Sequence, residues 1–213
     1  MSGGPDGRHR FEVLSSRTAY AGKVMALRVD EVSMPGGGSA VREVVEHPGA
    51  VAVAAVDEER RIVLVHQYRH PVGRRLWELP AGLLDVHGED PQVTARRELG
   101  EEVGLAAREW SVLVDLVASP GFTDEAVRIY LATGLSRVDR PGPMGDEEDD
   151  LQVRRFALGD AVRMVLAGEI VNASAIAGLL AAHAVFGGLG GTRPADAPWP
   201  GRPTSWAARR SGR

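Results

Sequence analysis

One stretch of the sequence decides how this chain folds: Arg97-Glu98-Leu99-Gly100-Glu101-Glu102-Val103-Gly104-Leu105. On a helix, Glu98, Glu101 and Glu102 stand at positions i, i+3 and i+4, so their side chains are neighbours. Like charges at this spacing disfavour a helix by roughly 0.2–0.5 kcal/mol per pair. We therefore expect a positive partner beside these carboxylates, and Arg97 alone cannot neutralise all of them.

The carboxylate cluster has two interpretations. Hard oxygen ligands in this number suit Mg²⁺ or Mn²⁺, which bind carboxylates together with water and substrate phosphate oxygens. The alternative is a charged helix face that is simply solvated, because surface helices often carry several glutamates. The spacing of the residues favours neither interpretation.

The ends of this helix are marked in the sequence. Asp90 is a good N-cap, and Pro91 suits the first helical position because its missing N–H has no partner there. Gly104 suits the left-handed position that ends a helix. An apolar stripe on the adjacent face would pack the helix against a sheet: Ala95, Leu99, Val103. The sequence therefore predicts a helix over 91–103.

Strand-like segments surround the helix. Two lie on either side of the turn Pro35-Gly36-Gly37-Gly38, a pattern typical of a hairpin. The predicted strands are 24–34, 40–47, 51–56, 62–68, 110–118, 127–132 and 153–156. Two further helices are predicted over 159–167 and 174–186. Strands before, between and after helices indicate a mixed α/β (α+β) domain.

Composition places the chain among ordinary globular proteins. Of 213 residues, 44% are hydrophobic and 25% charged, and the formal net charge is −4. A broadly acidic surface gives no general reason to bind nucleic acid. The absence of cysteine excludes disulfides, thiolate zinc sites and cysteine nucleophiles, and a cytoplasmic location is the simplest interpretation.

Neither end of the chain predicts packed structure. Residues 1–10 are polar and glycine-rich, without the apolar run of a signal peptide. The most apolar stretch, 173–190, is broken by glycine and carries a histidine, so it indicates a core helix and no membrane span. Residues 188–213 are rich in Gly, Pro and Arg and are expected to be disordered.

The glutamate stretch resembles the Nudix box, G-x5-E-x7-R-E-U-x-E-E-x-G-U, where U is aliphatic. Every element from Glu89 onward matches this pattern. One departure exists: six residues, not five, separate Gly82 from Glu89, so the loop before the helix carries an insertion. The resemblance implies a Nudix fold, with a mixed β-sheet between helices, and favours the metal interpretation of the carboxylates.

The resemblance also implies roles for individual residues. Glu98 and Glu102 would be the principal Mg²⁺ ligands together with the backbone carbonyl of Ala81, and Glu101 would take part in catalysis alongside them. Mn²⁺ is the alternative metal. The supporting residues would be Glu89 and Arg97, with Arg97 holding the carboxylates in place. The metal would neutralise the diphosphate oxygens and the leaving phosphate.

A second segment points to the substrate class. Ser119-Pro120-Gly121-Phe122-Thr123-Asp124-Glu125 resembles the proline marker of ADP-ribose pyrophosphatases, with Pro120 sixteen residues after Gly104. A plain Pro-Gly turn between strands is the alternative. The lead Trp77-Glu78-Leu79-Pro80-Ala81-Gly82 and the triplet Gln67-Tyr68-Arg69 also resemble this subfamily. The substrate-binding residues implied are Arg42, Arg69, Glu78, Gly82, Leu83 and Glu125. The implied activity is Mg²⁺-dependent hydrolysis of ADP-ribose to AMP and ribose 5-phosphate.

The same resemblance divides the chain and implies a partner. Residues 11–47 would form an N-terminal antiparallel β appendage, and 48–187 the Nudix hydrolase domain. In relatives the appendage exchanges between the subunits of a homodimer. Arg42 and Glu125 are therefore candidates for contacts across such a dimer.

A general base is expected outside the box. In the ADP-ribose subfamily a carboxylate on a loop has this role, and here the run Asp146-Glu147-Glu148-Asp149-Asp150 occupies that place. Such runs are usually only solvated. We predict Glu148 as the base, with Glu147 as the alternative.

Two other functions stay open. The enzyme could act on another nucleoside diphosphate sugar or a dinucleotide. A different class is a Nudix-fold module that senses ADP-ribose without hydrolysing it, although such modules tend to lose box carboxylates that are present here. The predicted partners are a nucleotide sugar and a second copy of the chain, with no nucleic acid and no membrane.

Overall fold

The computed structural model describes residues 8–140 and 150–211. The chain divides into two compact units. The smaller unit consists of Met1–Gly49, Ser119–Glu125 and Pro203–Arg213, and the larger unit of Ala50–Ala118 and Ala126–Arg202. The division places the predicted β appendage in one unit and the glutamate helix in the other.

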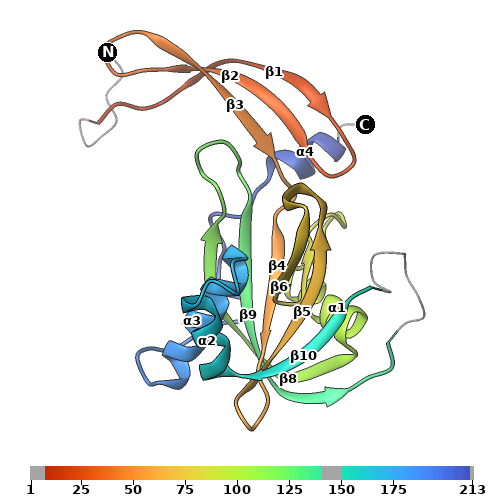
Figure 1. The fold of residues 1–213 in the computed structure, drawn as a ribbon. Helices are drawn as coiled ribbons and strands as arrows, with labels where there is room; N and C mark the ends of the chain where they lie inside the picture. The colour runs from red at the N-terminus through yellow and green to blue at the C-terminus, as the bar shows by residue number, and fades with distance from the viewer. Residues whose placement is uncertain (1–7, 141–149, 212–213) are drawn as a thin grey trace. The chain divides into compact units, whose positions relative to one another are not determined.

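The larger unit contains two sheets (Figure 1). One has the order β11-β8-β9-β4-β7 and the other β10-β5-β6. Their strands are β4 (Ala50–Ala55), β5 (Arg61–Arg69), β6 (Arg74–Glu78), β7 (Ala81–Leu83), β8 (Leu105–Val117), β9 (Ala126–Arg137), β10 (Gln152–Ala157) and β11 (Arg193–Pro194). β4 runs parallel to β9 and antiparallel to β7, which confirms the mixed sheet that the sequence predicts.

The strand β4 is buried on both faces, and its alternating side chains enter two separate cores. Ala52 and Ala54 belong to the core covered by α2 (Leu158–Leu166) and α3 (Ala173–Phe186). Val51 and Val53 belong to the core covered by α1 (Pro91–Val103). Figure 1 shows α1 and the α2–α3 pair on opposite sides of β4 and β9. A short 3₁₀ helix, η1 (His70–Val72), joins β5 to β6.

The ends of α1 are those that the sequence predicts. The Asp90 carboxylate accepts a hydrogen bond from the backbone N–H of Gln92 at 2.8 Å, and Pro91 is the first helical residue. Gly104 ends the helix with φ at 66°, a left-handed conformation that glycine adopts without strain. Ala95 and Leu99 are fully buried, so the predicted apolar stripe does anchor the helix.

The smaller unit is a three-stranded antiparallel sheet, β1 (Val13–Ala21), β2 (Ala26–Ser33) and β3 (Ser39–Glu46), with a short helix, α4 (Ser205–Ser211). The hairpin predicted across the glycine turn is confirmed by the pairing of β2 with β3. Gly36 and Gly37 have φ values of 93° and 91°, which explains why glycine occupies the turn. The strand β1 was not predicted from the sequence, and its nine residues are all exposed.

The prediction that residues 188–213 are disordered is wrong for the described part of this segment. In the larger unit, β11 pairs with β8, and the chain beyond it packs on Arg128, which is 3% exposed. Arg128 donates to the carbonyl oxygens of Ala197 at 2.6 Å and Pro198 at 3.0 Å, and its guanidinium lies 4.8 Å from the Trp199 ring centre. The tail is therefore held by a buried arginine of β9, and its own composition gives no sign of this interaction.

The end of the tail belongs to the smaller unit. Arg209 of α4 donates to both carboxylate oxygens of Glu46, at 2.7 and 3.0 Å, and to Thr18 Oγ1 at 2.6 Å. Glu46 is 3% exposed, and these hydrogen bonds from Arg209 lower its pKa. A second arginine, Arg28, lies 3.1 Å from the same carboxylate. The tail arginine thus neutralises a buried charge of the N-terminal sheet.

Across the described residues, no helix combines the length and apolar character that a membrane span requires.

Candidate metal and substrate site

Arg97 is the positive partner that the carboxylates of α1 require. Its Nη1 lies 2.8 Å from Oε1 of Glu98 and 2.8 Å from Oε2 of Glu101. Its Nη2 lies 3.5 Å from Oε2 of Glu89. One guanidinium therefore bridges three carboxylates.

Gly82 makes room for Glu98. A Cβ built on Gly82 would collide with the carboxyl group of Glu98, so this position on β7 accepts only glycine while Glu98 stays in place. Leu83, the next residue, ends β7 half-buried and pairs with Ala50 of β4. The box glycine therefore acts on the helix by leaving space for a carboxylate.

The negative charge of Glu102 is only partly compensated by the groups around it. Its Oε2 accepts a hydrogen bond from the backbone N–H of Ala81 at 3.1 Å. Burial raises the pKa of Glu102 to about 8, with the carboxylates of Glu98 and Glu78 acting in the same direction, while Ala81 and Arg69 oppose them. In the absence of a cation this group therefore binds a proton near neutral pH.

Arg69 and Glu78 form a bidentate ion pair. Arg69 Nε donates to Glu78 Oε1 at 3.0 Å and Nη2 donates to Oε2 at 2.8 Å. Gln67 Nε2 donates to the same Oε2 at 3.3 Å, and the Glu78 side chain is only 4% exposed. Arg69 and Glu78 are both predicted substrate-binding residues, and the structure brings them into direct contact.

The donor set fits a divalent cation. Glu98 and Glu102 offer hard carboxylate oxygens on one helix face, and the Ala81 backbone contacts Glu102. The raised pKa of Glu102 is that of a buried carboxylate near other carboxylates, which a cation would relieve. Within 8–140 and 150–211, no three Asp, Glu or His side chains already converge on one point, and Glu98 is instead turned to Arg97.

Two contacts around the helix were missed by the sequence analysis. Thr94 Oγ1 donates to Glu89 Oε2 at 2.6 Å, and Thr94 is fully buried. Arg140 Nε donates to the backbone carbonyl of Glu101 at 3.0 Å. The first contact had a signal in the sequence, because a hydroxyl stands on the face of α1 that otherwise buries apolar residues. The second had none.

The proline marker forms a turn in the smaller unit. Ser119 O accepts from the N–H of Phe122 at 3.1 Å, with the exposed Pro120 inside the turn. Val45 N–H then donates to Phe122 O at 2.7 Å, which joins the turn to β3. Glu125 is half-buried, and its backbone N–H donates to Thr123 Oγ1 at 3.1 Å.

Arg42, the other residue predicted on this unit, is exposed on β3. Its Nη1 donates to the carbonyl oxygen of Val41, its own neighbour, at 2.9 Å. The two proposed bases, Glu147 and Glu148, lie outside the described residues.

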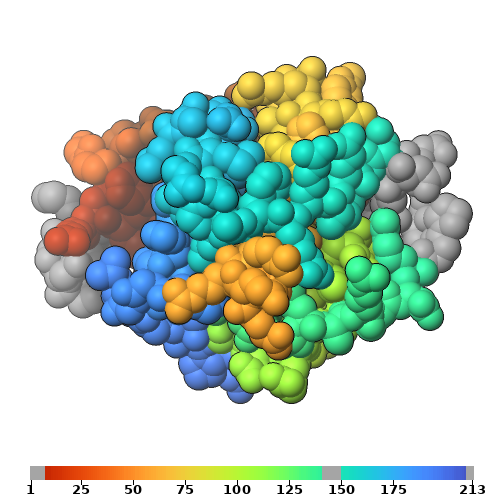
Figure 2. Space-filling view, turned by 60° about the horizontal axis from the view of Figure 1, so that its bottom comes forward, coloured from red at the N-terminus to blue at the C-terminus, as the bar shows by residue number. Residues whose placement is uncertain are grey.

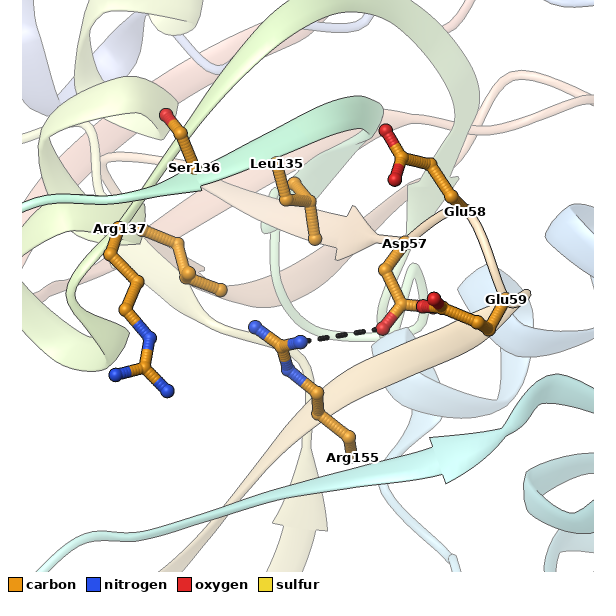
Figure 3. A pocket seen from close by; sticks show the side chains of 8 residues that line it. Asp57, Glu58, Glu59, Leu135, Ser136, Arg137 and Arg155 are labelled. Carbon is orange, nitrogen blue, oxygen red and sulfur yellow. Dashed lines mark hydrogen bonds and ion pairs between the residues drawn. The ribbon is translucent and has the colours of Figure 1, made fainter.

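A separate cavity of about 220 Å³ opens beside the turn between β4 and β5. This turn is coloured orange on the face drawn in Figure 2. Figure 3 shows Arg155 directed at Asp57, with Nη1 to Oδ2 at 3.4 Å. Arg61 Nε donates to the same oxygen at 2.9 Å. The cavity contains none of the predicted site residues, and Asp57, its least exposed charge, is already paired.

Known proteins match both parts of the chain. A family model described as the NUDIX domain matches residues 45–177, and one described as the nucleoside diphosphate sugar hydrolase N-terminal domain matches residues 11–45. The chain is 58% identical to a protein of Mycobacterium tuberculosis named ADP-ribose pyrophosphatase, over 96% of this chain and 99% of that protein. It is 40% identical to a protein of the same name from Bacillus subtilis, over 76% and 86%.

A solved structure supports the same assignment of the fold. Its title is "Crystal structure of ADP compounds hydrolase", and it matches with a TM-score of 0.73 at 21% identity, over 85% of this chain and 97% of that one. The box on α1, the mixed sheet beneath it and the family model across most of the chain agree. This chain belongs to the Nudix hydrolase family.

Proposed function

We propose that this protein hydrolyses the diphosphate of ADP-ribose to AMP and ribose 5-phosphate, with Mg²⁺ as its cofactor. The observation that carries the proposal is the carboxylate face of α1, where Arg97 contacts Glu98 and Glu101, and Glu102 accepts a hydrogen bond from the backbone N–H of Ala81. Two similar proteins named ADP-ribose pyrophosphatase support the choice of substrate.

The metal would be held by Glu98, Glu102 and the carbonyl oxygen of Ala81, with Mn²⁺ as a possible substitute. When bound, such a cation supplies positive charge that offsets the negative charge of the diphosphate and of the leaving phosphate. Arg97 would keep the glutamate side chains in place through its contacts with Glu98 and Glu101.

Hydrolysis adds a hydroxyl group to one phosphorus, breaks the P–O–P anhydride bond and transfers a proton to the departing phosphate. Glu148 would accept the proton of the attacking water, with Glu147 as the alternative. Glu101 would take part next to the metal ligands. The water-activating carboxylate would thus come from the loop and the metal ligands from α1.

Predicted substrate-binding residues occur in each unit. In the larger unit, Arg69 has the planar guanidinium that suits a diphosphate, and Glu78 holds it in a fixed orientation. Gly82 and Leu83 would line the approach to the metal. In the smaller unit, Arg42 and Glu125 would contact the nucleoside.

The substrate choice is tested by a panel of nucleoside diphosphate derivatives with Mg²⁺, with AMP and ribose 5-phosphate measured by chromatography. We expect ADP-ribose to have the highest kcat/KM, by about tenfold or more, because a site that pairs with polar groups of one sugar leaves them unpaired with another. Faster turnover of GDP-mannose would reverse the choice of substrate. No hydrolysis of any compound would favour a sensing module.

We also propose that the protein is a homodimer. The sheet of the smaller unit exposes large apolar side chains on β1 and β3, among them Val13 at 59%, Leu14 at 56%, Tyr20 at 59% and Val41 at 64%. A sheet of three strands usually needs a second layer to bury such surface. A second copy of this chain is the partner proposed, in the cytoplasm, which suits a chain without cysteine.

Val41→Glu is expected to weaken this dimer, because it places a charge in the buried surface. Sedimentation equilibrium should give twice the chain mass of 22.7 kDa for the wild type and a mixture or the monomer mass for the variant. Leu166→Glu, at a residue of α2 that is 80% exposed, is the matched control and should remain dimeric. A wild-type mass of one chain would contradict the proposal.

A further inference from the structure

Thr94 is a polar residue on the buried face of α1, and no sequence motif above assigns it a role. It is 0% exposed, and its Oγ1 lies 2.6 Å from Oε2 of Glu89, the first glutamate of the box. A hydroxyl–carboxylate hydrogen bond of this length is at the short, charge-assisted end of the range. Thr94 therefore makes a strong contact outside the set of residues that carry the chemistry.

The carboxylate that Thr94 holds also meets Arg97. Nη2 of Arg97 is 3.5 Å from Oε2 of Glu89, whereas Nη1 is 2.8 Å from oxygens of Glu98 and Glu101. One end of the guanidinium therefore faces Glu89, and the other faces the glutamates next to the proposed metal. A fixed Glu89 adds a third charged contact that restricts the orientation of the guanidinium, because its fork is planar and rigid.

The segment that carries Glu89 needs an anchor. It contains the extra residue between Gly82 and Glu89, and its residues 85–88 are exposed. Its backbone is held by Arg202, whose Nη2 donates to the carbonyl oxygen of Glu89 at 3.4 Å. The side chain of Glu89 is held by Thr94, which lies on the buried face of α1. The Thr94 contact is the shorter of the two and the one shielded from solvent.

We propose that Thr94 is a positioning residue for the metal site: it fixes Glu89, and Glu89 in turn orients Arg97 against the metal-binding glutamates. The inference rests on the proposed function in one respect, the metal site on α1. It does not depend on which nucleotide is cleaved. Partners that contact metal ligands directly typically change metal affinity by about 10–100-fold when removed, and Thr94 acts through Glu89 and Arg97, so we expect the lower end of this range.

The experiment measures Mn²⁺ binding directly, by electron paramagnetic resonance without substrate, for two matched variants. Thr94→Val keeps the shape and loses the hydroxyl, whereas Thr94→Ser keeps the hydroxyl. We expect the Kd for Mn²⁺ to rise about tenfold in the valine variant, and the serine variant to stay within about threefold of the wild type. Thr94→Ala removes the hydroxyl with a good helix former and takes the place of the valine variant if that one does not fold.

The control is Thr133→Val. Thr133 Oγ1 also donates to a glutamate, Glu109, at 3.2 Å, but this pair is exposed on β8 and β9. Its removal should leave Mn²⁺ binding unchanged. A merely structural role of Thr94 would lower the melting temperature without changing the Kd, and this outcome in a folded variant would overturn the proposal.

A double-mutant cycle tests the route through Glu89. If Thr94 acts through that carboxylate, Thr94→Val should change the Mn²⁺ affinity of Glu89→Gln by less than about twofold. If the two substitutions weaken Mn²⁺ binding by free energies that add fully in the double variant, the proposal is overturned. A wild type that binds Mn²⁺ but hydrolyses no nucleotide would contradict the proposed function and leave this test intact. A wild type that binds no Mn²⁺ would overturn both.

Discussion

Glu102→Gln is expected to abolish hydrolysis and to make the metal-free protein more stable at pH 8. Glutamine keeps the size of the side chain and the acceptor for the Ala81 N–H, but it removes the charge. Loss of a charged metal ligand removes several kcal/mol of transition-state stabilisation, so kcat should fall by about 10²–10⁴-fold. The two effects have opposite signs, so general misfolding of the variant cannot account for both of them.

The stability effect follows from the raised pKa of Glu102, which burial shifts to about 8 from its ordinary value of 4.5. Between these two values the folded state holds a proton that the unfolded state has released. The contribution of Glu102 to the free energy of unfolding of the metal-free wild type therefore falls as pH rises, by up to about 1.4 kcal/mol per pH unit. The glutamine variant lacks this dependence, so its advantage should be absent near pH 4 and largest at pH 8 and above.

Thermal melts of both proteins in chelator, from pH 5 to pH 8.5, measure this difference. Glu58→Gln, at an exposed residue of the β4–β5 turn, is the matched control and should follow the wild type in melting and in turnover. Added Mg²⁺ should raise the melting temperature of the wild type and not that of Glu102→Gln. Wild-type turnover in Glu102→Gln would contradict the assignment of this residue to the metal site.

Glu148→Gln is expected to reduce kcat by about 10²–10⁴-fold, the usual contribution of a general base, while KM and Mn²⁺ affinity change little. Glu147→Gln is the alternative, and only one of the two variants should show the full loss. The physical reason is that glutamine keeps the hydrogen-bonding shape of the side chain but cannot accept the proton of the attacking water.

Steady-state kinetics with ADP-ribose across pH distinguish this role from simple charge loss in the acidic run 146–150. The neighbouring variants Asp146→Asn and Asp149→Asn remove the same charge from the same run and should keep turnover near that of the wild type. Unchanged kcat in both glutamate variants would place the base elsewhere. Equal losses in all four variants would indicate an electrostatic effect of the whole run.

The elements predicted best from the sequence are those whose signals are local. The helix α1 was predicted with its observed bounds, Pro91–Val103, because its cap, its first proline and its terminal glycine all lie within it or beside it. The hairpin of β2 and β3 was predicted from its glycine turn. The strands β5, β9 and β10 were also predicted, although each is longer than expected.

Several of the elements that were missed depend on partners far away in the sequence, and β1 lacks a local signal. The three-residue strand β7 exists through its pairing with β4, and its own sequence is too short to indicate it. The exposed strand β1 lacks the alternation of buried and exposed residues that marks a strand. The ordered tail depends on Arg128 and Glu46, which are 69 and 163 residues away from their partners Ala197 and Arg209.

The sequence by itself determined the family, the helix that carries the carboxylates and the residue types of the site, because spacing along a helix is a local property. Only the tertiary structure decided how these groups are held. The short contact of Thr94 with Glu89, the pairing of Arg69 with Glu78 and the raised pKa of Glu102 arise from burial and from contacts between separate elements. The strength of these contacts and the size of the pKa shift depend on distances in space, and the order of residues along the chain does not specify those distances.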